Sequence, residues 1–128
     1  EQFRNLVPLI SKASLLKALV LTGNALTNNS FKQISEISKN LPHLSLLDVS
    51  YNSMIINELT DEIENLHHVT ELNLSGNKWQ QYPLGEICDA LFCHPSIISL
   101  HLNDFYCHQF CDFSNFKQRL EAKCFLRE

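Results

Sequence analysis

The spacing of apolar residues repeats along most of the chain. The segment from Leu16 to Leu26 has leucine at its first, fourth, sixth and eleventh positions and asparagine at its ninth, a pattern written LxxLxLxxNxL. The segments that start at Leu44 and Val69 repeat it, with apolar residues in the leucine positions and asparagine again at the ninth. Three copies in one register indicate a repeated structural unit.

A fourth, degenerate copy follows the three regular ones. It starts at Ile97, but Phe105 stands where asparagine is expected and Cys107 fills the last apolar position. The four starts are separated by 28, 25 and 28 residues. A repeat of this length has room for one strand and one helix, and the lost asparagine predicts that the regular array ends near Phe105.

Each copy predicts one short β-strand and a turn. In the first copy Leu19 and Leu21 alternate with Ala18, Val20 and Thr22, so the leucines point to one side of the strand and the other residues to the opposite side. The asparagine belongs to the turn after the strand. Its amide can donate and accept hydrogen bonds for backbone groups that water cannot reach. The leucines therefore build the interior and the asparagines satisfy the turns.

A polar linker after each strand leads to apolar residues at helical spacing. These residues are Phe31, Ile34, Ile37 and Leu41 after the first strand, Leu59, Ile63 and Leu66 after the second, and Leu84, Ile87 and Leu91 after the third. Ser30 with Gln33 fits a capping box and predicts the start of the first helix. Pro42 and Pro95, each two residues ahead of a new copy, predict the helix ends.

The two ends of the chain differ from the repeats. Residues 1–15 have the apolar spacing of the residues 28 positions later, and they predict a helix that is a partial repeat or a cap. If nothing covers the strand at 19–21, it forms an open sheet edge, and such edges invite pairing. Residues 108–128 predict an amphipathic cap helix from four apolar residues on a charged stretch: Phe113, Phe116, Leu120 and Phe125.

The copies resemble leucine-rich repeats, and their helix-backed lengths of 25 to 28 residues resemble the ribonuclease-inhibitor-like subclass. The resemblance covers residues 3–107. It implies an α/β fold: a solenoid with parallel β-strands on the concave face, helices on the convex face and a C-terminal capping helix. About four repeats are expected, at 16–43, 44–68, 69–96 and, in degenerate form, 97–107. Such a scaffold is expected to recognise a protein partner through its concave strands.

The register gives the outward side chains of the four strands. Their rows are Ala18, Leu46, Glu71 and Ser99, then Val20, Asp48, Asn73 and His101, then Thr22, Ser50, Ser75 and Asn103. An apolar centre with polar neighbours is typical of a protein-binding patch. We predict this site at Ala18, Val20, Leu46, Asp48, Glu71, Asn73 and His101, with Tyr51 at the rim. The simpler interpretation is that one exposed leucine is ordinary surface.

Cysteines and histidines gather in the C-terminal third: Cys88, Cys93, His94, His101, Cys107, His108, Cys111 and Cys124. Thiolates and imidazoles can bind zinc, cysteines can form disulfides, and buried thiols can act as small apolar fillers. The register favours packed thiols, because Cys107 takes the position of Leu26 and His94 that of Leu41. No metal site and no cofactor are therefore predicted.

The sequence gives little support for catalysis. Its three glycines form no phosphate-binding loop, and it contains no GxSxG or HExxH motif. The best acid–base pair on the concave face, Asp48 with His101, lies two strands apart, or roughly twice 4.8 Å. That separation excludes a direct hydrogen bond. We therefore predict no catalytic residue and no enzyme.

Charge and composition narrow the setting. A net charge of −4 suits neither nucleic acid nor an anionic membrane as partner, and no stretch has the roughly 18 apolar residues of a membrane helix. Five cysteines, an odd number, without a secretory leader favour an intracellular, cytoplasmic setting. The many Asn, Lys, Ile and Ser residues would suit a secreted bacterial effector that acts in a host cell.

Together these patterns predict a non-catalytic protein–protein interaction module. The alternative is the structural end segment of a longer solenoid. In that case the open N-terminal sheet edge would dock on a neighbouring domain or mediate homo-association.

Overall fold

Strands and helices alternate along the chain. The computed structural model describes residues 2–80, 85–104 and 106–107. Its elements are α1 (Gln2–Ser11), β1 (Ala18–Val20), α2 (Asn28–Ser38), β2 (Leu46–Asp48), the 3-10 helix η1 (Ile56–Glu58), α3 (Thr60–Glu64), β3 (Glu71–Asn73), β4 (Lys78–Trp79), α4 (Gly85–Phe92), β5 (Ser99–His101) and β6 (Tyr106–Cys107). None of the helices in this described part has the length and hydropathy that a membrane crossing requires.

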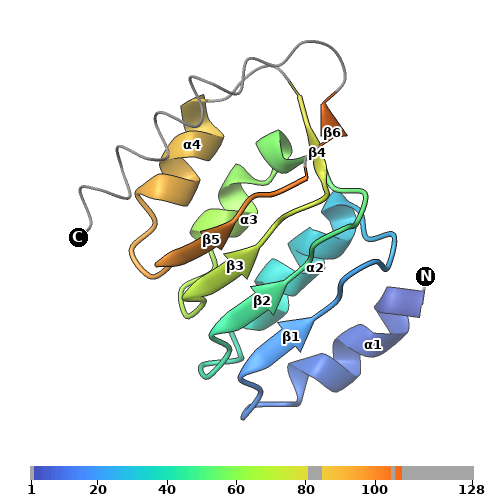
Figure 1. The fold of residues 1–128 in the computed structure, drawn as a ribbon. Coiled ribbons are helices and arrows are strands. Elements are labelled where there is room, and N and C mark those ends of the chain that lie inside the picture. Colours follow the sequence, from blue (N-terminus) through green and yellow to red (C-terminus); the bar gives the residue numbers. More distant parts are fainter. Residues whose placement is uncertain (1, 81–84, 105, 108–128) are drawn as a thin grey trace.

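Four parallel strands form the main sheet, in the order β1-β2-β3-β5. Parallel neighbours need a crossover connection, and α2, α3 and α4 supply it. All of these helices lie on one side of the sheet (Figure 1). In the register, Leu19, Leu47, Leu72 and Leu100 form one row across the sheet. The structure confirms the expected α/β class and this parallel register.

Backbone pairing continues beyond the main sheet. β4 pairs in parallel with β6, so that Lys78 lies opposite Tyr106 and Trp79 opposite Cys107. Cys107 thus takes the register position that the sequence gave it. The degenerate fourth copy therefore does not end the strand pairing, although Phe105 itself and residues 108–128, where a cap helix is predicted, lie outside the described residues.

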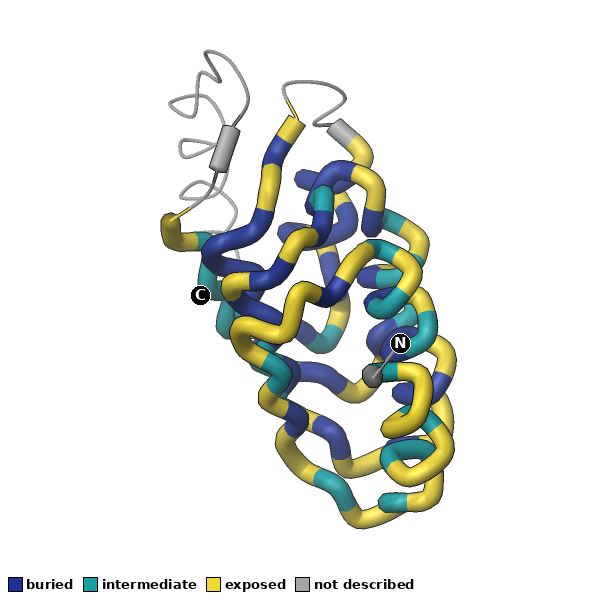
Figure 2. Tube along the Cα trace, turned by 90° about the vertical axis from the view of Figure 1, so that its right-hand side faces the viewer, coloured by how far each residue is buried: buried dark blue, intermediate teal, exposed yellow. Residues whose placement is uncertain are grey.

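The core lies between the sheet and the helices, where Figure 2 shows the buried residues. Leu47 and Leu72 from the strands are fully buried, and so are Phe31, Ile34 and Ile63 from the helices. These are the positions that the repeated pattern assigns to the interior. Removing so many apolar side chains from water is the main stabilising contribution to the fold.

The repeated asparagines join neighbouring turns. The Asn52 amide donates to the carbonyl oxygens of Leu21, Val49 and Ser50, and its Oδ1 accepts from the backbone N–H groups of Asn24 and Leu26. Asn77 repeats the arrangement one turn further, where it accepts from Met54 and donates to Val49, Leu74 and Ser75. The expected role of the repeated asparagines is confirmed.

A second set of asparagine contacts was not predicted. Asn28, at the start of α2, accepts from the Ile55 N–H at 2.8 Å and donates to the Ile55 carbonyl oxygen at 3.1 Å. Asn57 makes the same pair of contacts with the backbone of Gln80, at 2.9 and 2.8 Å. Each asparagine mimics the edge of a β-strand and fixes the next turn. The two lie 29 residues apart and off the main pattern, which is why the sequence did not reveal them.

The outer layer differs in detail from the expectation. α2 begins at Asn28 with Thr27 as its N-cap, and the Ser30 hydroxyl accepts from the Thr27 N–H at 3.2 Å. The predicted box of Ser30 with Gln33 is therefore wrong, because Ser30 is the partner of the cap and not the cap itself. The helix expected around Leu59 to Leu66 is reduced to η1 and the five-residue α3.

Candidate functional site

One face of the main sheet is not covered by helices. We call it the open face; its residues are Ala18, Val20, Leu46, Asp48, Glu71, Asn73, Ser99 and His101. Ala18 and Val20 are exposed, with Val20 at 60%, and the other six are half-buried. All seven strand residues of the predicted site lie here. Whether they bind a partner is a proposal treated below.

The apolar part of the open face lies over β1 and β2. Ala18 stands directly opposite Leu46, and Val20 stands opposite Asp48 in the next row. Side chains directly opposite each other on neighbouring strands are in contact range. Ala18, Val20 and Leu46 therefore form one continuous apolar strip at the β1 end of the face.

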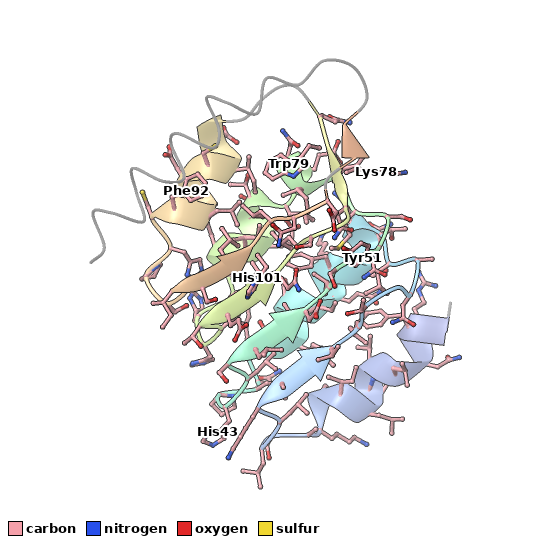
Figure 3. The ribbon with its side chains drawn as sticks, viewed as in Figure 1. His43, Tyr51, Lys78, Trp79, Phe92 and His101 are labelled. Carbon is pink, nitrogen blue, oxygen red and sulfur yellow. The ribbon has the colours of Figure 1, made fainter. Side chains whose placement is uncertain are left out.

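The polar part lies over β3 and β5. His101 Nε2 lies 3.0 Å from Glu71 Oε1, and both side chains are about two-fifths exposed (Figure 3). Glu71 is opposite Ser99 in the register, so the contact with His101 runs diagonally. Sequence reasoning considered Asp48 as the acidic neighbour of His101 and missed Glu71. Long side chains reach diagonal neighbours on a sheet, which is the signal that could have found this pair.

Ser99 completes a group that resembles a catalytic triad only in composition. Ser99 Oγ lies 3.4 Å from His101 Nε2, the same nitrogen that faces Glu71. In a triad the carboxylate holds one ring nitrogen and the nucleophile uses the other. Here both groups address one nitrogen in a half-exposed setting. This geometry gives Ser99 no oriented base.

Asp48 and Asn73 are partly engaged with their own turns. Asp48 Oδ1 accepts from the backbone N–H and the hydroxyl of Ser50, at 2.9 and 2.6 Å, and Asn73 Oδ1 accepts from the Ser75 N–H at 3.1 Å. Ser50 and Ser75 are themselves buried. The expectation that all three rows face solvent is therefore wrong for the third row, because its serines turn inward to satisfy the strand-to-turn backbone.

Tyr51 lies at the rim with an unusual backbone. Its φ is +54°, and the equivalent residue of every strand exit is also left-handed: Gly23 (+69°), Gly76 (+69°) and Asp104 (+55°). A bulky residue seldom adopts this conformation. The Tyr51 ring covers Gly76 so closely that a Cβ there would lie 2.4 Å from Cδ1, and the Tyr51 hydroxyl donates to Asp104 at 2.5 Å. The half-exposed ring is thus fixed across two neighbouring turns.

The cysteines and histidines are dispersed in the described part of the chain. His94 is buried, and its Nε2 lies 2.9 Å from the Ile63 carbonyl oxygen, while Nδ1 accepts from the Ser96 and Ile97 N–H groups. These contacts require the neutral ring with its proton on Nε2. Cys88 is buried and Cys93 is exposed. No group of three metal-binding side chains occurs in residues 2–80 and 85–104, and His108, Cys111 and Cys124 lie outside the described residues.

A small hollow of about 310 Å³ lies between α1 and α2. Its lining is Phe3, Arg4, Thr27, Asn29, Ser30 and Gln33. The walls contain one charged group and no carboxylate, histidine or cysteine, so they offer no acid–base or metal chemistry. The open face therefore remains the candidate functional site.

Comparison with known proteins identifies a fold. No protein-family model matches the sequence, and no curated protein matches it. Two solved structures are similar to this chain. One is the tropomodulin C-terminal domain from Caenorhabditis elegans, with a TM-score of 0.69, 12% identity, and coverage of 96% of this chain and 73% of that one. The other is leiomodin-1 actin-binding site 2, with a TM-score of 0.70, 10% identity, and coverage of 97% and 88%.

These matches correct the expected family. At 10% and 12% identity they show a shared fold, and that fold is the small α/β fold of the tropomodulin and leiomodin domains. The assignment to ribonuclease-inhibitor-like leucine-rich repeat proteins is wrong. It rested on repeat length alone, whereas the outer layer includes the short η1 and α3 in place of a full helix.

Proposed function

We propose that this chain is a non-catalytic protein-binding module that holds its partner on the open face. The observation that carries the proposal is the layout of that face. An apolar strip of Ala18, Val20 and Leu46 adjoins polar groups that already have a fixed orientation. Apolar contact at the centre and ordered polar groups around it are the usual composition of a protein interface.

The polar groups suit binding because they are ordered before a partner arrives. Glu71 and His101 hold each other, and Asp48 is held by Ser50. Tyr51 adds an aromatic ring whose position is fixed by Gly76 and Asp104. Side chains that are already ordered lose less entropy on binding. The same arrangement gives no oriented nucleophile, which supports a non-enzymatic role.

The partner is a protein, and actin is the first candidate to test. One of the two similar structures is described as an actin-binding site, and this is the reason for the choice. The cytoplasm is the setting that we propose. The prediction of a bacterial effector rests on composition alone and gains no support from these similarities.

We also propose the finer architecture. The strand–helix units would form a solenoid of about four repeats between residues 16 and 107, with residues 1–15 as its first helix and residues 108–128 as a cap. The common register of β1, β2, β3 and β5 supports this arrangement.

Substituting the centre of the open face is expected to abolish partner binding. Leu46→Arg with Glu71→Arg places two cations on residues that stand opposite each other in β2 and β3. We expect loss of binding to monomeric and filamentous actin, measured by sedimentation and by fluorescence anisotropy, with an affinity decrease of at least about a hundredfold. Thermal unfolding should change little, because both side chains are partly exposed and the Glu71–His101 pair is a weak surface interaction.

A matched control separates the site from net charge. Asn40→Arg with Glu64→Arg adds the same three positive charges at exposed positions on the helix side. This variant should bind like the unmodified chain. If neither form of actin binds, the same pair of variants is used to compare proteins captured from a cell extract. Equal capture by the Leu46/Glu71 variant would contradict the open-face proposal.

A further inference from the structure

The end of the molecule at α1 and β1 exposes residues whose counterparts are buried elsewhere. Leu6 and Leu9 of α1 occupy the positions that Ile34 and Ile37 occupy in α2, 28 residues later. Ile34 and Ile37 are 0% and 8% exposed, whereas Leu6 and Leu9 are 43% and 68% exposed. α1 packs against α2, and no described element packs on the other side of α1. The apolar face of this helix is therefore left without a neighbour.

The neighbouring strand shows the same asymmetry. β1 is an edge strand, with β2 on one side only. Leu16 and Leu21 on either side of it are half-buried, whereas the equivalent Leu44 and Val49 around β2 are buried. Leu15, just before β1, is 76% exposed. We call the combination of Leu6, Leu9, Leu15 and the outer edge of β1 the end surface.

The charges around the end surface have one sign. Residues 2–35 contain Arg4, Lys12, Lys17 and Lys32 and no aspartate or glutamate, although the whole chain has a net charge of −4. Arg4, Lys12 and Lys17 are exposed on α1 and on the segment that leads into β1. The end surface is therefore an apolar area with a basic border, in contrast to the open face, whose charged residues include Asp48 and Glu71.

We propose that the end surface binds an acidic polypeptide segment with alternating apolar side chains, added as a further strand on β1. The open edge supplies unpaired backbone groups for strand addition. The exposed leucines supply apolar contact, and the lysines attract acidic side chains and repel basic ones. This surface is separate from the open face, so the inference does not depend on the proposed function.

The same charges argue against a second copy of this chain as the occupant. A symmetric contact places identical surfaces together, so Lys12 and Lys17 of one copy would approach Arg4, Lys12 and Lys17 of the other. Like charges at a contact raise its free energy. Homo-association through the N-terminal sheet edge, which the sequence suggested, is therefore disfavoured relative to binding of an acidic partner.

Two synthetic peptides test the inference on the intact chain. One alternates leucine with glutamate and the other alternates leucine with lysine, and each carries a fluorophore for anisotropy. We expect the glutamate peptide to bind at least about tenfold more tightly than the lysine peptide, with an affinity that falls as salt rises. Lys12→Glu with Lys17→Glu should reverse the preference, and Leu6→Ser with Leu9→Ser should weaken binding of both peptides.

Two further variants and one measurement serve as controls. Lys39→Glu with Lys78→Glu makes the same change in charge at exposed positions outside the end surface and should leave peptide binding unchanged. The open-face variant Leu46→Arg with Glu71→Arg should also retain it. No binding of the glutamate peptide, equal binding of both peptides, or binding that ignores the Lys12/Lys17 change would overturn the proposal. So would a dimer in light scattering that Leu9→Arg dissociates, because a second copy would then be the occupant.

Discussion

Replacing Asn77 with alanine is expected to lower the free energy of unfolding by roughly 3–5 kcal/mol. Asn77 is fully buried, accepts from the Met54 N–H, and donates to the carbonyl oxygens of Val49, Leu74 and Ser75. Alanine would leave these backbone groups without a partner where water has no access. Each buried group that loses its partner costs about 1–3 kcal/mol. Urea unfolding followed by circular dichroism measures the difference.

Asn24→Ala is the matched control for this prediction. Asn24 has the same place in the first copy of the pattern, but its side chain is exposed and donates to the Thr22 carbonyl oxygen. Water can replace that partner, so we expect a loss of roughly 1 kcal/mol or less. Equal losses for Asn77→Ala and Asn24→Ala would mean that the buried asparagine contacts do not stabilise the stacked turns.

The second large effect is expected at Gly76. Gly23 and Gly76 share a φ of +69°, so alanine at either position costs roughly 1–2 kcal/mol of backbone strain. Only at Gly76 would the new Cβ meet the Tyr51 ring, at 2.4 Å from Cδ1, whereas Gly23 has no atom within 4 Å of that position. Overpacking adds about 1–3 kcal/mol. Gly76→Ala should therefore destabilise the chain clearly more than Gly23→Ala in the same unfolding assay.

A double-mutant cycle assigns the excess to Tyr51. In the Tyr51→Ala background the ring is absent, and Gly76→Ala should cost no more than Gly23→Ala costs in the unmodified chain. An undiminished cost would show that the ring does not fix the Gly76 turn. In that case Tyr51 would not be the ordered rim residue that the proposed binding site requires.

The repeated spacing of apolar residues was sufficient to predict the parallel sheet and its register. The period of two around Leu19 and Leu47 places one side chain in the core and the next on the open face, and a slip by one residue would bury Asp48. The asparagines could be read equally well, because a buried amide in a turn has one evident use. These features depend on local spacing, which a single sequence contains.

Contacts between long side chains and between turns were harder to predict. Glu71 reaches His101 diagonally, and Asp48 turns back to its own Ser50, so a comparison of directly opposite residues missed both contacts. The left-handed backbone of Tyr51 has no signal in the tyrosine itself. The available clue was that Gly23 and Gly76 directly precede a patterned asparagine, as Tyr51 does.

The family assignment failed for a different reason. Repeat length and leucine spacing report how the scaffold is built, and unrelated proteins can share those requirements. The similarity to the tropomodulin and leiomodin domains exists at 10% and 12% identity, so it lies in the arrangement of elements and not in residues that the sequence displays.

Site-specific photo-crosslinking tests the central claim, that a protein partner lies on the open face. Benzoylphenylalanine is placed at Leu46 or Glu71 on that face, and at Asn40 or Glu64 on the helix side. Each form is illuminated with actin, or with the protein that the capture experiment yields. The account predicts covalent products from positions 46 and 71 and none from 40 and 64. Crosslinks from the helix side, with none from the open face, would contradict it.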